Sequence, residues 1–166
     1  MTFALQKGYR MAELSNTVAD GLASYYEHIA ADLHKWTDPL PEEQFWRNPF
    51  SFGNSVGHLV LHLTGNLSYY IGAQVAGTGY VRDRPREFAE SERPQKAGVL
   101  QAFDQAIAMV VDTIRKQTPD GWSAPYTAVG QENTRNRFKI LLHCAGHAYH
   151  HVGQIIYLSR ELAKPG

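Results

Sequence analysis

The chain has 166 residues, and its 16 lysines and arginines are balanced by 16 aspartates and glutamates. This length suits one domain with a real core, so we expect a single domain over residues 1–166. The balanced charge offers no basic field to attract nucleic acid or a membrane surface, and it excludes both as partners. No apolar run approaches the roughly 18 residues that a membrane span needs. The one cysteine, Cys144, excludes an intramolecular disulfide and favours a reducing cytoplasm.

Four stretches have the apolar periodicity of helices, at about residues 13–36, 54–76, 94–117 and 134–163. Segments rich in glycine and proline separate them, because proline lacks the amide that a helix needs and glycine ends helices. Four long amphipathic helices with little room for strands predict an all-α four-helix bundle. The connectors all exceed ten residues, so the pattern alone leaves the winding of the bundle open.

Two connectors carry expectations of their own. The charged segment 82–88 contains Pro85, and its charge predicts a solvated loop that is not helical around the proline. Residues 122–133 form a connector that we expect to pair briefly as extended chain.

Six of the eight histidines fall in two short segments of the chain. In the last helix His143, His147 and His151 are four residues apart, which places them on one face. His147 and His151, on adjacent turns, can direct two imidazole nitrogens at one point, as paired histidines do in zinc sites.

The second helix repeats this arrangement with His58 and His62, and Asn66 and Tyr69 continue the same face. If the two faces meet, three imidazoles can bind a divalent transition metal and leave coordination positions open. The alternative is a set of hydrogen-bonded core histidines. Several buried imidazoles without a metal would carry a desolvation cost and repel one another when protonated, which favours the metal. Spacing alone does not select three ligands among the five histidines.

The same residues resemble a known family, the DinB/YfiT-like superfamily of metalloproteins. Residues 55–67 match its pattern Ser-hydrophobic-Gly-x-x-x-x-His, whose histidine falls on His62. Residues 147–156 match its signature His-x-x-x-His-x-Gly-Gln, whose histidines fall on His147 and His151. Segment 82–88 and the Trp46–Arg47 pair resemble one branch of the superfamily, whose function is unknown. This resemblance implies that segment 82–88 forms part of the rim of the site rather than a solvated loop.

The resemblance implies a four-helix bundle with up-down-down-up winding, a zinc or nickel ion, and often a homodimer. It also implies transfers or isomerisations that depend on low-molecular-weight thiols. Many relatives have an acidic residue near the first histidine of the last helix, whereas this chain has Gly146 and Ala148 there.

The remaining polar residues near these motifs receive candidate roles. His58 and His143, one turn from the ligands, are candidates for proton transfer or for support of a ligand, with a hydrogen-bonded core histidine as the alternative. Four more residues are expected to orient a bound group or close its pocket, with core packing as the alternative for the aromatic ones: Asn66, Tyr69, Gln154 and Trp46.

Three functions follow from a three-histidine site. The first is a transferase in which a metal-bound thiolate attacks a small electrophilic substrate. The second is a non-enzymatic metal- or ligand-binding stress-response protein, which a fourth ligand such as His58 or His143 would favour. The third, metal-dependent hydrolysis, is weakened because neither histidine motif contains an acidic residue to act as general base.

The last helix has a second apolar stripe away from its histidines, which predicts burial on two sides. We expect this stripe to contribute to a symmetric dimer, and packing inside the bundle is the alternative. It consists of Leu142, Ala145, Tyr149, Val152 and Ile156.

Overall fold

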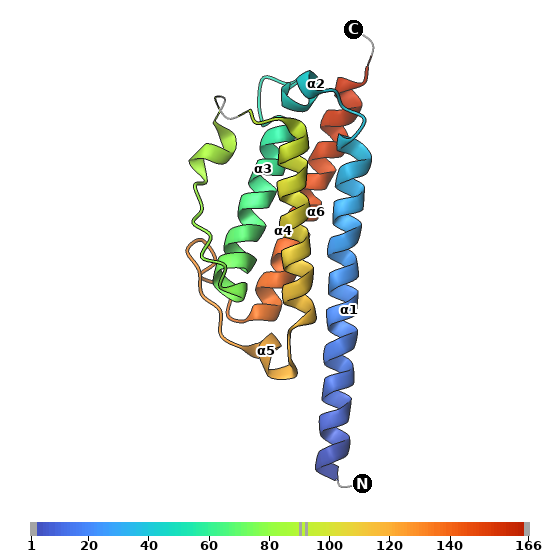
Figure 1. The fold of residues 1–166 in the computed structure, drawn as a ribbon, viewed down its shortest axis with the longest axis vertical. Coiled ribbons are helices and arrows are strands. Elements are labelled where there is room, and N and C mark those ends of the chain that lie inside the picture. Colours follow the sequence, from blue (N-terminus) through green and yellow to red (C-terminus); the bar gives the residue numbers. More distant parts are fainter. Residues whose placement is uncertain (1–2, 90, 92, 165–166) are drawn as a thin grey trace.

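Four long helices form the bundle in the computed structural model, which describes residues 3–89, 91 and 93–164 (Figure 1). They are α1 (Phe3–Thr37), α3 (Val56–Leu67), α4 (Lys96–Arg115) and α6 (Arg137–Leu162). Within the described part of the chain there is no β-strand, and one isolated antiparallel bridge joins Pro125 to Asn136. The expected all-α four-helix bundle is confirmed. The connector before α6 pairs at this one bridge, with a partner that lies just beyond residues 122–133.

The two helices that carry the histidine pairs are neighbours in the bundle. Both α1 and α3 pack against α4 and α6, so α3 and α6 are in direct contact. In Figure 1 the chain ascends along α1 and α6 and descends along α3 and α4. The histidine faces of α3 and α6 therefore meet across an antiparallel helix pair.

Four shorter elements lie between the long helices, namely α2 (Glu42–Trp46), η1 (Ser68–Ala76), η2 (Pro85–Phe88) and α5 (Pro119–Ser123). The π-helical element η1 continues α3 and ends at Gly77, whose φ of 70° lies in the left-handed region that glycine tolerates.

The prediction that segment 82–88 avoids helical structure around Pro85 was wrong. Pro85 opens the single 3₁₀ turn η2. A proline in the first turn is tolerated because the amide it lacks has no partner there. Residues 118–121 lie beyond the end of α4 at Arg115 and start α5, where the Thr118 hydroxyl accepts a hydrogen bond from the Gly121 amide at 3.1 Å.

Helix α1 is longer than expected, because it begins at Phe3 rather than near residue 13. In Figure 1 its N-terminal end projects well beyond the other helices. Further along, the fully buried Tyr26 donates a hydrogen bond of 2.7 Å to the carbonyl oxygen of Leu141, which ties α1 to α6.

Helix α4 is long and apolar enough to cross a membrane by length and composition alone, although Asp104 and Asp112 interrupt its apolar residues. Half of its most apolar window is buried inside the bundle, and it packs against α1 and α3. The core helix of a bundle needs this composition without any membrane.

The second apolar stripe of α6 is divided between core and surface. Ala145 and Val152 are buried, and Ile156 packs against the core. Leu142 and Tyr149 are exposed, at 52% and 43% of their surface. Part of the stripe is therefore used inside the bundle, and the rest is available to a partner.

Candidate metal centre

Helix α3 places His62 in the interior. The Ser55 hydroxyl caps this helix by accepting a hydrogen bond from the His58 amide at 3.2 Å. Two turns into the helix, His62 is buried and faces α6, where His147 and His151 are half-buried on successive turns. The i, i+4 spacing on α6 and the packing of α3 against it bring these three imidazoles together.

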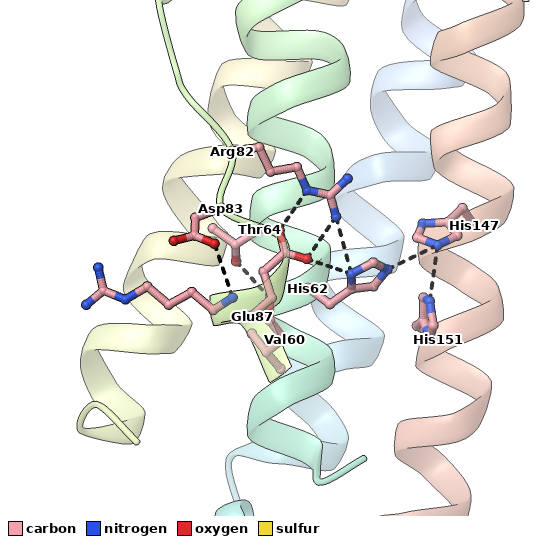
Figure 2. Close-up of polar contacts among 9 residues, drawn as sticks. Val60, His62, Thr64, Arg82, Asp83, Glu87, His147 and His151 are labelled. Atoms are coloured by element: carbon pink, nitrogen blue, oxygen red, sulfur yellow. Dashed lines mark hydrogen bonds and ion pairs between the residues drawn. The ribbon is translucent and has the colours of Figure 1, made fainter. Parts of the chain in front are cut away.

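The three side chains direct their Nε2 atoms at a common point (Figure 2). The Nε2 atom of His147 lies 3.4 Å from that of His62 and 3.1 Å from that of His151. Zinc–nitrogen bonds of 2.0–2.1 Å in a tetrahedral site would place two ligand nitrogens about 3.3 Å apart. The separations therefore fit three imidazoles around one divalent ion.

The electrostatics keep the two imidazoles of α6, His147 and His151, neutral. Burial and the neighbouring imidazoles lower the pKa of His147 from 6.5 to about 3, and burial also lowers the pKa of His151. A neutral imidazole has a free lone pair, which is the form that binds a metal. His147 and His151 are therefore poor at holding protons and available to bind a cation.

Two hydrogen-bond acceptors hold the outer nitrogens of the triad. Nδ1 of His62 lies 2.8 Å from Oε2 of Glu87, and Nδ1 of His151 lies 2.7 Å from Oε1 of Gln154. Arg82 binds Glu87 through Nε at 2.7 Å and through Nη2 at 2.8 Å. Such contacts fix the tautomer and ring orientation of histidines that bind metals. The third outer nitrogen, Nδ1 of His147, is buried without a hydrogen-bond partner among the described residues.

A model of the DinB superfamily matches residues 25–155 of the chain. The chain belongs to the DinB superfamily. Its fold is similar to the crystal structure of a DinB-like protein from Bacillus cereus, with a TM-score of 0.68 and 14% sequence identity over 89% of this chain and 95% of that one. No curated protein matches it.

Glu87 is the residue of this DinB-superfamily site that sequence reasoning missed. The family resemblance placed segment 82–88 at the rim, but nothing in the sequence indicated which of its side chains points inward. Burial on its own would raise the pKa of Glu87, but the hydrogen bonds from His62 and Arg82 outweigh it and lower that pKa. The site therefore contains a carboxylate, supplied by η2 rather than by either histidine motif.

The two other candidate histidines lie outside the triad. Nδ1 of His58 is 2.9 Å from the Ser55 hydroxyl, and Nε2 is 3.3 Å from the carbonyl oxygen of Ala89. His143 is exposed, and its Nε2 lies 3.0 Å from the side-chain nitrogen of Gln131. Within the described ranges, His62, His147 and His151 form the one group of histidine, cysteine or acidic side chains close enough to share a metal.

The remaining candidates occupy different environments. Asn66 is buried on the histidine face of α3, and its Oδ1 has no hydrogen-bond partner among the residues described. Tyr69 is half-buried, with its ring 5.0 Å from that of Tyr70. Trp46 is buried in the core, where its ring and that of His58 form a T-shaped pair with centroids 5.3 Å apart. Of these three, Asn66 is best placed for a polar group near the triad.

A pocket of about 470 Å³ lies between residues 50–54, α3 and α6. Aromatic and aliphatic side chains form most of its wall, and Gln154 and His150 are among its polar residues. Gln154 hydrogen-bonds Nε2 of His150 at 3.2 Å as well as His151, so it connects the pocket wall to the triad. The other residues of the wall are Phe50, Phe52, Gly53, Asn54, Leu59, Gly153, Tyr157 and Leu158.

Proposed function

We propose that this DinB-superfamily protein binds one divalent transition metal, zinc or nickel, through His62, His147 and His151, and acts as a metal-dependent thiol transferase. The observation that carries the proposal is the convergence of three imidazoles without a fourth protein ligand in the described part of the chain. Three protein ligands with open positions are typical of catalytic rather than structural sites.

When bound, such a metal lowers the pKa of a thiol or water in its open positions and supplies a nucleophile at neutral pH. The residues of the chain then position the reactants. Gln154 orients His151 and borders the pocket, and the apolar wall of the pocket suits an apolar electrophile of small size.

The nucleophilic sulfur would have to come from a small molecule. Cys144 is the one cysteine of the chain, and it is fully buried. Burial raises the pKa of its thiol to about 12, so it is not a thiolate at neutral pH. This favours a low-molecular-weight thiol as co-substrate.

The two alternative functions have less support. A non-enzymatic protein whose metal only staples the helices would be favoured by a fourth ligand, but the ring nitrogens of His58 contact Ser55 and Ala89 instead. A hydrolase needs a free general base. Both oxygens of Glu87 are occupied by Arg82 and His62, so it is poorly placed to accept a proton from water.

The metal is tested by elemental analysis of purified wild-type protein beside His151→Ala, with His143→Ala as the matched control from the same helix. We expect about one equivalent of zinc or nickel in the wild type and in the control, and a large loss in His151→Ala. Equal metal content in all three would remove His151 from the site.

The activity is tested by screening the metal-loaded protein with small thiols, such as glutathione and cysteine, against aromatic and alkyl halide electrophiles. Thiol consumption that requires both the metal and His151 would support a transferase. Metal binding without any turnover across the screen would favour the binding protein.

Two further proposals concern the surroundings of the protein. We propose a cytoplasmic location, which the single reduced cysteine supports, and a homodimer, which the exposed apolar residues of α1 and α6 support.

A further inference from the structure

The feature that the proposed function leaves unexplained is a buried ion pair beside the triad. Glu87 and Arg82 lie on the segment that follows η1, and less than a tenth of either side chain is exposed. Figure 2 shows Arg82 and Glu87 on one side of His62, with His147 and His151 on the other. Two charged groups are seldom buried unless their geometry is well satisfied, which calls for a reason.

Both oxygens of the Glu87 carboxylate are engaged, by two partners. One oxygen receives Nε of Arg82, and the other receives Nη2 of Arg82 and lies 2.8 Å from Nδ1 of His62. Nη2 of Arg82, which can only donate, also lies 3.3 Å from this Nδ1. The carboxylate can only accept and is closer, so we infer that Nδ1 of His62 carries the proton and donates it to Glu87. Its Nε2 is then unprotonated and directs a lone pair toward His147.

Helix α3 is shaped to admit this carboxylate. A Cβ atom on Gly65 would lie 2.1 Å from Oε1 and 2.9 Å from the carboxyl carbon of Glu87, which is far inside van der Waals contact. Gly65 lies inside the helix, where glycine is unfavourable compared with alanine. The absence of a side chain there is what allows Glu87 to reach His62.

The segment is also held beyond Glu87. Nε2 of His58 contacts the carbonyl oxygen of Ala89 at 3.3 Å. The ring centroids of Phe88 and His62 are 5.0 Å apart. His58 thus serves as an anchor for the end of η2 and leaves neither ring nitrogen for proton transfer.

We propose that Glu87, clamped by Arg82 and admitted by Gly65, is a positioning residue that sets the tautomer and orientation of His62 for metal binding. This inference rests on the proposed metal site. Contacts of this kind change metal affinity by ten- to a hundredfold when they are removed.

The test is the zinc affinity of the full-length protein, measured by competition with a chelator, together with the melting temperature of the metal-free form. We expect Glu87→Ala and Gly65→Ala each to weaken zinc binding by roughly ten- to a hundredfold. Glu87→Gln, which retains an acceptor oxygen but no charge, should weaken it less than Glu87→Ala. The melting temperature of each metal-free variant shows whether its weaker zinc binding is due to unfolding.

Matched controls come from a surface ion pair and a free helical glycine. Glu27 pairs with Arg115 at 2.9 Å on the surface, and a Cβ atom on Gly21 would meet nothing within 4 Å. Glu27→Ala and Gly21→Ala should therefore leave zinc affinity unchanged. Zinc affinity in folded Glu87→Ala within twofold of the wild type would overturn the inference.

A second readout covers the case in which the Glu87 and Gly65 variants fail to fold. Nitrogen NMR of the wild-type, metal-free protein reports which ring nitrogen of His62 is protonated. A proton on Nδ1 supports the inference, and a proton on Nε2 overturns it. Zinc binding that is unchanged in the folded variants overturns this inference alone, whereas a wild type that binds no zinc overturns the proposed function as well.

Discussion

The side-chain oxygen of Gln154 lies 2.7 Å from Nδ1 of His151, three residues earlier on α6. This spacing follows from the helix, which places residues three apart on one face. Gln154 also hydrogen-bonds His150 at the pocket, so one amide group touches both the proposed metal ligand and the proposed substrate wall.

Replacing Gln154 by alanine should weaken zinc binding several-fold, because His151 loses the acceptor that orients its ring. The effect should be smaller than that of Glu87→Ala because Gln154 is exposed and water can replace it. Gln154→Glu should bind zinc at least as tightly as the wild type, because a charged acceptor strengthens the hydrogen bond. Chelator competition measures both variants, and Gln105→Ala, exposed on α4, is the control. An unchanged affinity in Gln154→Ala would show that the contact does not act on the metal.

Filling the pocket should block substrate without removing the metal. A Cβ atom on Gly153 would meet nothing within 4 Å, and this residue lines the pocket. Gly153→Leu should therefore fold, keep its metal content, and weaken the binding of an apolar naphthalene dye by roughly tenfold or more. Gly146→Leu is the matched control, since Gly146 is also exposed on α6 with open space around it. Equal dye binding by both variants would place the ligand elsewhere.

The metal-free protein should lose stability in mild acid. The pKa of His147 is lowered to about 3 in the folded chain, against about 6.5 in the unfolded chain. Between these values the unfolded chain binds the additional proton, so the free energy of unfolding falls as the pH drops below about 6.5. We expect a loss of about 1 kcal/mol between pH 7 and pH 5, after allowance for the partial exposure of His147.

Urea unfolding of chelator-treated protein at both pH values measures this loss. His147→Asn removes the titrating group and should reduce the pH dependence by that amount. An identical pH dependence in the wild type and the variant would mean that His147 is protonated normally in the fold.

Alanine at Gly57 should destabilise the fold. Its Cβ atom would lie 2.5 Å from two ring atoms of Trp46 and 2.9 Å from a ring atom of Phe45. Overpacking of this kind costs about 1–3 kcal/mol, which exceeds the gain of up to about 1 kcal/mol that alanine brings to a helix. Gly21→Ala, with open space around its Cβ atom, should instead be neutral or stabilising. Thermal unfolding separates the two, and a Gly57→Ala protein as stable as Gly21→Ala would contradict the expectation.

A second copy of the chain should cover the exposed apolar residues of α1 and α6. Leu14 on α1 is 58% exposed, and Leu142 on α6 is 52% exposed. A two-fold dimer uses the same surface on both subunits, so a charge introduced at Leu142 would occur twice in the contact. Sedimentation velocity at micromolar concentration should show a dimer for the wild type and a monomer for Leu142→Glu. Val129→Glu, at an exposed valine in the connector before α6, should stay dimeric. A monomeric wild type would rule out the dimer.

Local sequence was enough to predict the parts of the site that lie on one helix. His147 and His151 meet because residues four apart share a helical face, whatever surrounds them. The glycine and proline breaks likewise indicated four helices, since these residues act on the local backbone. Spacing left five histidines as candidate ligands, and the family pattern reduced them to three.

The contacts between different elements became visible only in the folded chain. It brought His62 to His147 through the packing of α3 on α6, and it turned Glu87 of η2 inward to His62. No local pattern marks Glu87 as an inward residue, because its position depends on the path of the segment after η1 and on the space left by Gly65. Periodicity records which face a residue occupies on its own helix, but contacts between elements depend on how the whole chain packs.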